Sequence, residues 1–228
     1  VHGSPCQDFS QAGKQYGGNV EDGTRSSLMF ETIRIIENLG AWKPKVVIWE
    51  NVKGALSRKL VSAFNRYLDD LERLGYTNSY DILDARDFGI PQYRERVFVI
   101  SILGNKAFDF SKLRKRPMRP IQEFLEKEVD EKYIVTQPSM LRRIDVPENK
   151  HSNSSFKGRV KVIKDYCYTI TTKQMRSPNA GVIDLGNGKY RYLTERECWR
   201  LMGFDDEDFD KAHREHPTRP GYMNTTLY

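Results

Sequence analysis

The sequence predicts an α/β fold, because three signals alternate over its first 104 residues. These signals are apolar residues at helical spacing, short continuous apolar runs, and glycines directly after the periodic segments. Alternating helices and buried strands are typical of an α/β domain with a parallel sheet. A chain of 228 residues with 38% hydrophobic content is long enough for such a domain and a smaller companion.

Residues 28–39 (LMFETIRIIENL) predict the first helix, with Ser26 and Ser27 as candidate caps and Gly40 as the stop. The apolar run that follows, KVVIWEN at 45–51, is typical of a strand buried on both faces, as in a parallel sheet. The same reasoning predicts a second helix that ends at Gly75, with Leu60, Phe64, Tyr67, Leu71 and Leu74 on one face, and two strands at 79–83 and 96–103.

The chain changes character after Leu103. Residues 105–188 are rich in Lys, Arg, Ser, Asn and Pro and carry short β-branched stretches, with one helical patch at 121–128. This composition predicts a smaller, irregular, strand-rich domain. A helix returns after Thr194, which forms a capping box with Glu197. We therefore expect three regions, namely 1–104, 105–188 and a return segment at 189–228 that packs on or near the first domain.

Composition narrows the function classes. No apolar run approaches the length of a membrane span, and the first residues lack the features of a signal peptide. Three widely spaced cysteines fit neither a disulfide framework nor a zinc cluster, so we expect no metal and a reducing, cytoplasmic compartment. A net charge of +6 and a pI of about 9.1 favour a polyanionic partner such as nucleic acid. For the basic stretch at 112–119, a solvated linker is an equally good interpretation.

Cys6 stands in an unusual setting for a cysteine. Core cysteines usually pack among aliphatic side chains, whereas Cys6 lies between Pro5 and Gln7 and precedes a polar, glycine-dotted loop. The proline fixes the backbone before the thiol, and the glycines leave the following segment free to move. This pattern predicts a presented nucleophile followed by a mobile flap.

Further reactive groups lie at the ends of the predicted strands. Glu50 and Asn51 end the run VVIWEN, and Gln92, Arg94 and Arg96 lie in QYRER, immediately before the last strand. Open α/β sheets bind ligands at the carboxyl ends of their strands, so a thiol, a carboxyl and two guanidinium groups are expected in one cleft. Taken singly, the simpler interpretations are a helix cap for Glu50 and surface ion pairs for the arginines.

Four motifs in this order, GSPCQDFS, ENV, QYRER and TERECWRLMGF, resemble those of the cytosine carbon-5 methyltransferases, which methylate cytosine in DNA. The resemblance extends from residue 1 to about 209. It implies the second half of a doubly wound, Rossmann-like methyltransferase sheet plus a smaller, irregular, strand-rich target-recognition domain. It also implies that Cys6 is the nucleophile, that Glu50 contacts the flipped base, and that Arg96 holds the base oxygen with Arg94 in support.

The chemistry of cytosine explains these residue types. Carbon 5 is a poor nucleophile, so the Cys6 thiolate first adds to carbon 6 while Glu50, protonated or sharing a proton, hydrogen-bonds ring nitrogen 3. Carbon 5 then takes the methyl group of S-adenosylmethionine, and loss of its proton expels the thiolate. We expect positive surroundings for Cys6 and a buried setting for Glu50. The resemblance assigns Pro5 and Leu28 to S-adenosylmethionine, most of whose site is expected outside this chain.

A cytosine inside a duplex must be flipped out of the stack to meet these groups. The loop at 7–23 offers polar groups to the opened helix and cations to the phosphates. Thr169 and Ile170 resemble the Thr-Leu pair of the family's recognition domain, and Gln and Arg at 172–177 are residue types that read purine edges. The expected DNA-binding residues are Gln7, Ser10, Lys14, Gln15, Arg25, Gln92, Thr169, Gln174 and Arg176.

The family's glycine-rich cofactor turn and its closing motif are not found in this sequence. We therefore expect either a fragment of a longer bacterial or phage modification enzyme, or a chain whose missing half is supplied by another polypeptide. Because a half-sheet exposes an apolar edge and face, we expect the isolated chain to self-associate or to be only marginally stable. Two alternatives stay open: a transfer RNA cytosine-5 methyltransferase, and a non-enzymatic DNA-binding remnant. A cysteine hydrolase is disfavoured, since no histidine is placed as a base for Cys6.

Overall fold

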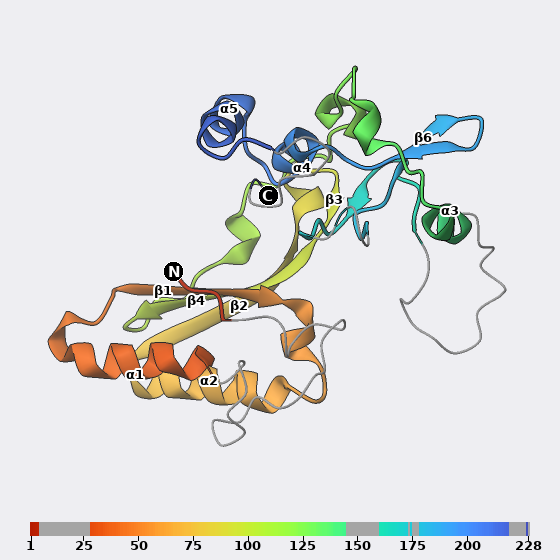
Figure 1. The fold of residues 1–228 in the computed structure, drawn as a ribbon. Coiled ribbons are helices and arrows are strands. Elements are labelled where there is room, and N and C mark those ends of the chain that lie inside the picture. The colour runs from red at the N-terminus through yellow and green to blue at the C-terminus, as the bar shows by residue number, and fades with distance from the viewer. Residues whose placement is uncertain (5–27, 145–159, 173, 175–177, 219–226, 228) are drawn as a thin grey trace. The chain divides into compact units, whose positions relative to one another are not determined.

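The computed structural model of this chain describes residues 1–4, 28–144, 160–172, 174, 178–218 and 227 (Figure 1). They form two compact units, one made of 1–84 with 95–114 and the other of 85–94 with 115–228. This division differs from the expected regions, because 85–94 joins the second unit, 105–114 joins the first, and 189–228 belongs to the second. That the units act as catalytic and recognition domains stays a prediction.

The first unit contains a three-stranded sheet in the order β1-β4-β2. Its strands are β1 (Val46–Val52), β2 (Tyr76–Asp84) and β4 (Glu95–Leu103). The α/β class is confirmed, but β4 pairs antiparallel with both neighbours, so the expectation of a parallel sheet is wrong for these strands. The physical reason is the connection from β2 to β4, which contains no α-helix, whereas a parallel pair needs a crossover of roughly a dozen residues or more.

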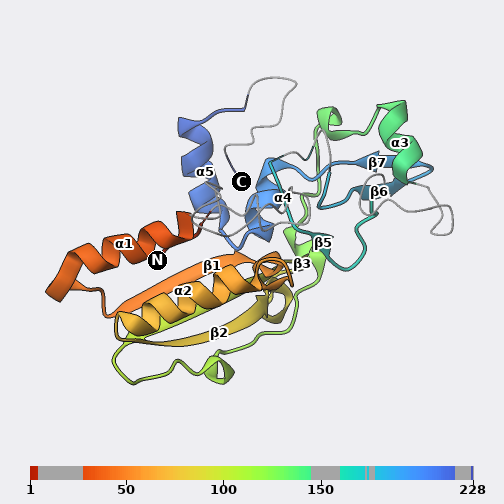
Figure 2. The same ribbon diagram turned by 90° about the horizontal axis from the view of Figure 1, so that it is seen from below.

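Two helices lie on the same side of this sheet, α1 (Met29–Leu39) and α2 (Val61–Arg73) (Figures 1 and 2). Both predicted helices are confirmed, although the expected caps, Ser26 and Ser27, lie outside the described residues. The helices and the sheet share one apolar core, whose buried members include Met29, Ile33, Ile36, Val47, Trp49, Phe64, Tyr67, Leu71, Val97 and Val99.

Burial alternates along β1 and shows which face of the sheet carries the core. Val47, Trp49 and Asn51 are buried, whereas Ile48 and Glu50 are only partly covered. The expectation that both faces of this strand are buried is therefore wrong within the described unit. Since side chains alternate along a strand, Glu50 lies on the face opposite to the buried Trp49.

The N-terminal residues extend the sheet beyond β1. The backbone NH of His2 donates to the Ile48 carbonyl at 2.8 Å, and the Glu50 NH donates to the His2 carbonyl at 3.2 Å, which makes a parallel bridge. The ring of His2 is hydrogen-bonded through Nε2 to the Tyr67 hydroxyl at 2.7 Å and through Nδ1 to the Thr32 hydroxyl at 3.1 Å. Burial is the main cause that lowers the pKa of His2 from 6.5 to about 4.

This histidine makes the stability of the first unit pH-dependent. Because its folded-state pKa is lowered, the neutral ring contributes stability above pH 6.5 that is lost as the pH falls from 6.5 toward about 4. Allowing for its partial exposure, we expect the wild type to lose about 1–2 kcal/mol in this window that a His2→Gln variant does not lose. Hydrogen exchange of the β1 and α2 amides at pH 7 and pH 4.5, each corrected for the intrinsic exchange rate, measures this difference in the first unit, with exposed His216→Gln as the control. Parallel pH profiles for wild type and His2→Gln would contradict it.

The second unit contains short elements around two apolar clusters. Its strands are β3 (Gln92–Tyr93) and β5 (Cys167–Tyr168), which pair in parallel, and β6 (Ile183–Gly186) and β7 (Lys189–Arg191), which form a hairpin. Its helices are α3 (Pro138–Ile144), α4 (Glu195–Leu201) and α5 (Asp206–Glu215). The predicted capping box of α4 is confirmed. The helical patch expected at 121–128 is only a short 3₁₀ turn, Ile121–Phe124.

A buried ion pair connects β7 to α4. The carboxylate of Glu197 is fully buried and accepts two hydrogen bonds from the Arg191 guanidinium, both at 2.8 Å. Its oxygens also accept from the backbone NH groups of Glu126 at 2.8 Å and Thr194 at 2.9 Å. Next to it, the Tyr133 hydroxyl donates to the buried Glu195 carboxylate. Four donors thus satisfy one buried charge, which fixes α4 in the second unit.

Candidate active site

Glu50 and Arg96 form an ion pair on the partly covered face of the first unit's sheet. The register places Val52 of β1 opposite Arg96 of β4, so Glu50 is the diagonal neighbour of Arg96 on the same face. The Arg96 Nε lies 3.0 Å from a Glu50 carboxylate oxygen. The Glu50 side chain is 38% exposed and that of Arg96 16%. The expectation of a buried Glu50 is therefore wrong for the described residues, while its proximity to Arg96 is found.

The chain leading to Cys6 is held at the same end of β1. The Ser4 hydroxyl accepts from the Trp49 indole NH at 3.1 Å and from the Asn51 amide at 3.0 Å, and the same amide donates to the Ser4 carbonyl at 3.0 Å. Gly3 lies beside Glu50, since an added Cβ would stand 3.7 Å from its carboxylate. These positioning roles of Trp49, Asn51 and Ser4 were not predicted from the sequence. The position of Asn51 directly after Glu50 was the one sequence feature that could have indicated them.

A second ion pair flanks the first one. Lys53, directly after β1, donates to the Glu95 carboxylate at 3.0 Å and 3.2 Å. The Arg96 guanidinium also donates to the Glu95 carbonyl at 2.8 Å. Arg94 belongs to the second unit, where its carbonyl accepts from the Ala85 NH at 3.2 Å. Glu50 and Arg96 are therefore brought together within the first unit, and the supporting role of Arg94 stays a prediction.

The two described cysteines are unsuited to act as nucleophiles. Cys167 and Cys198 are free thiols and fully buried in the second unit. Burial raises the pKa of Cys167 to about 12, and burial together with the Glu197 carboxylate raises that of Cys198 well above its usual value. Both thiols are therefore protonated at neutral pH, and the thiolate is the reactive form. Cys6, which lies outside the described residues, is the remaining candidate.

Several residues expected to contact DNA have internal roles in the second unit. Gln92 is buried, and its amide donates to the Leu201 carbonyl at 2.8 Å while its oxygen accepts from the Ile170 NH at 3.2 Å. The Thr169 hydroxyl donates to the Tyr93 carbonyl at 3.0 Å. Gln174 is also buried, and its oxygen accepts from a backbone NH within the unit. The side chains of Gln92 and Gln174 are enclosed in this conformation, and their contact with DNA stays a prediction.

The other expected site residues are only partly described. Leu28 precedes α1, and 48% of it is exposed. The remaining expected residues lie outside the described part of the chain, and they are Pro5, Cys6, Gln7, Ser10, Lys14, Gln15, Arg25 and Arg176.

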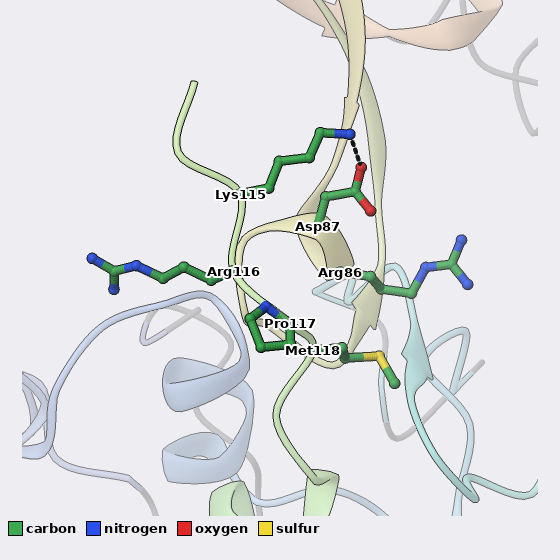
Figure 3. A pocket seen from close by; sticks show the side chains of 6 residues that line it. All are labelled: Arg86, Asp87, Lys115, Arg116, Pro117 and Met118. Carbon is green, nitrogen blue, oxygen red and sulfur yellow. Dashed lines mark hydrogen bonds and ion pairs between the residues drawn. The ribbon is translucent and has the colours of Figure 1, made fainter. Parts of the chain in front are cut away.

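The second unit also has an open pocket of about 500 Å³, lined by Arg86, Asp87, Lys115, Arg116, Pro117 and Met118 (Figure 3). Lys115 forms an ion pair with Asp87 at 2.8 Å. Arg86 and Arg116 extend to opposite sides of the pocket, as Figure 3 shows. Their charges therefore do not converge on one point, and the pocket does not resemble the catalytic cleft expected from the sequence.

Comparison with known proteins decides the family. The family model described as C-5 cytosine-specific DNA methylase matches residues 1–219. The chain belongs to this family. Among curated relatives, this family member is 41% identical over 217 residues to the type II methyltransferase M2.ScrFI of Lactococcus lactis subsp. cremoris, covering 91% of this chain and 56% of the relative. It is 32% identical over 214 residues to the type II methyltransferase M.DsaV of Dactylococcopsis salina, covering 90% of this chain and 58% of that protein.

Solved structures give the same fold for this C-5 cytosine-specific DNA methylase chain. The methyltransferase EhMeth of Entamoeba histolytica matches with a TM-score of 0.70 at 19% identity, covering 100% of this chain and 69% of that one. The chain spans little more than half the length of the curated relatives it matches. Glu50 and Arg96 lie within the matched residues, but the comparisons assign no role to either.

Proposed function

We propose that this chain supplies the base-activating half of a DNA cytosine-5 methyltransferase of the restriction-modification type. The reaction is transfer of a methyl group from S-adenosylmethionine to carbon 5 of a cytosine flipped out of duplex DNA. One observation carries the proposal: the Glu50–Arg96 pair lies at the end of β1, where Trp49 and Asn51 also hold Ser4. Because consecutive Cα atoms are ~3.8 Å apart, the Cα of Cys6 lies within about 8 Å of the Cα of Ser4.

In the proposed mechanism the Cys6 sulfur forms a bond to carbon 6 of the cytosine. The electron pair displaced from the carbon 5–carbon 6 double bond is stabilised as Glu50 donates a proton to ring nitrogen 3. Arg96 orients the Glu50 carboxyl and donates to the base oxygen. Carbon 5, now enamine-like, takes the methyl group as the bond between that methyl and the donor sulfur breaks, and S-adenosylhomocysteine leaves. A base then removes the carbon 5 proton while the carbon–sulfur bond to Cys6 breaks, and the thiolate and the nitrogen 3 proton return to the enzyme.

S-adenosylmethionine supplies the electrophilic methyl group. In the described part of this chain, exposed Leu28 at the start of α1 offers an apolar surface that fits an adenine or methionine portion. Pro5 is the other proposed contact, and the rest of the site is proposed to lie on residues outside this chain. The free thiols of Cys167 and Cys198 are consistent with action in a reducing cytoplasm. In the described part of the chain, no helix is both long enough and apolar enough to cross a membrane.

The first unit exposes an apolar surface that a partner would cover. The segment from Leu28 to Val46 exposes five large apolar side chains, which include Ile35 at 53% and Trp42 at 86%. Exposed apolar surface of this kind marks an interface, and among the described residues the outer edge of β1 pairs only with the short N-terminal bridge at His2. We propose that a second copy of this chain, or another polypeptide that carries the cofactor motifs, covers this surface.

Transfer of a labelled methyl group from S-adenosylmethionine to a duplex tests the function. We expect transfer that disappears in Cys6→Ser, since a hydroxyl at that position is not ionised at neutral pH. Cys198→Ser is the matched control and should retain transfer if it stays folded. The assay should be run over a range of chain concentrations, because a site completed by self-association gains specific activity with concentration. Transfer to transfer RNA but not to DNA would contradict the proposal, as would activity in Cys6→Ser.

A further inference from the structure

One cluster in the second unit is not used by the proposed chemistry. It consists of Arg86, Tyr93, Tyr166 and Tyr168 and is called here the arginine–tyrosine cluster. The Arg86 guanidinium lies over the Tyr93 ring at 4.5 Å from its centroid and over the Tyr166 ring at 4.9 Å. The three rings meet edge to face, with centroids 5.8–6.4 Å apart. None of the four side chains is fully buried.

The pairing of β3 with β5 builds this cluster. Tyr93 is the register partner of Tyr168, and Gln92 that of Cys167. Side chains alternate along strands, so the tyrosines share one face while Gln92 and Cys167 enter the core on the other. Residues 166 and 168 are two apart, which places both rings on the same face. The three tyrosines therefore do not lie on the face that packs into the core, since Gln92 and Cys167 occupy that face. Packing in the core does not explain why tyrosines stand at these positions.

The cluster has the chemistry of a phosphate contact. A guanidinium that stacks on aromatic faces has a planar edge of NH donors, and the geometry of that edge matches a phosphate. The Tyr166 hydroxyl has no hydrogen-bond partner among the described residues, so it is an unused donor beside the cation. Arg86 also borders the pocket of Figure 3, although Arg116 of that pocket extends to the opposite side. The positive charge that complements a polyanion is therefore that of Arg86 itself.

We infer that the arginine–tyrosine cluster holds a backbone phosphate of the bound duplex, and this inference rests on the proposed DNA substrate. Phosphate contacts set the position of a protein on DNA without reading sequence. The cluster includes Tyr93 of the QYRER motif, between Gln92 and Arg94.

The test measures binding of the full chain to a labelled duplex over a series of salt concentrations. We expect Arg86→Gln to weaken binding about 5–20-fold and to lower the slope of log affinity against log salt by about 1. Tyr166→Phe removes only the hydroxyl and should weaken binding about 2–5-fold, as for one lost hydrogen bond. Lys189→Gln, an exposed cation on β7, and Tyr80→Phe in the first unit are the matched controls. Thermal unfolding shows whether each variant is folded. If Arg86→Gln does not fold, the Tyr166→Phe variant alone still tests the inference.

The outcomes separate this inference from the proposed function. Wild-type binding that Arg86→Gln and Tyr166→Phe leave no weaker than their controls would overturn the phosphate contact and leave the methyltransferase proposal intact. A loss in affinity with an unchanged salt slope would also overturn it, since a lost phosphate contact must reduce that slope. A wild-type chain that transfers methyl groups only to single-stranded DNA would overturn the duplex contact without touching the chemistry.

Discussion

Replacing Glu50 by glutamine lowers the rate of methyl transfer about 10²–10⁴-fold, the range expected when a positioned acid–base group is lost. Glutamine has nearly the same shape, but it cannot give a proton to ring nitrogen 3 when the Cys6 thiolate adds to the base. The variant should fold normally, because the Glu50 side chain is 38% exposed and pairs with Arg96 near the surface. Initial rates with saturating duplex and S-adenosylmethionine, in a preparation where the wild type is active, measure the effect.

A matched control separates this role from a general loss of charge. Glu95 is the neighbouring carboxylate, half-buried and paired with Lys53 as Glu50 is with Arg96. Glu95→Gln should leave the rate within about 3-fold of wild type, since no step of the mechanism uses it and partly exposed ion pairs contribute little. Equal rate losses in both variants would show that Glu50 acts only through local electrostatics. An unchanged rate in Glu50→Gln would remove it from the mechanism.

The largest loss of stability is expected from Glu197→Gln. The Glu197 carboxylate accepts four hydrogen bonds in a fully buried setting, two of them from Arg191. A neutral amide leaves the Arg191 charge uncompensated and points an NH₂ group at donors, which costs about 3–5 kcal/mol. Hydrogen exchange of the α4 amides measures this locally. The chain has two units, and chains of several units do not in general unfold in a single two-state transition.

Two further variants define what the ion pair does. Glu207→Gln breaks an exposed pair with Lys211 on α5 and should leave the exchange of the α4 amides unchanged, because exposed ion pairs contribute little to stability. The double variant Arg191→Met with Glu197→Leu removes both charges and should be less destabilised than Glu197→Gln alone. If the double variant is as unstable as the single one, the loss reflects packing around α4 rather than an unpaired buried charge.

Elements with strong local signals were predictable from the sequence. The apolar spacing of 28–39 and 60–74 produced α1 and α2, and Thr194 with Glu197 produced the cap of α4. Helix α5 was not predicted. Its acidic first turn resembles a solvated charged segment, and because only Phe209 along it is buried, the helix has no apolar periodicity that would indicate it. The direction of β4 was also missed, since an apolar strand looks the same in either direction and the connection decides how it pairs.

For the candidate site, the chemical groups and the strand ends at which they lie were predictable from local patterns. Glu50 follows one apolar run and Arg96 precedes another, and strands end where apolar runs end. Which groups meet depends on the tertiary fold: the antiparallel register brings Arg96 to Glu50, Asn51 turns inward to Ser4, and Gln92 is enclosed between α4 and Ile170. The physical reason is that strand register and burial depend on contacts between segments far apart in the chain, which no local pattern encodes.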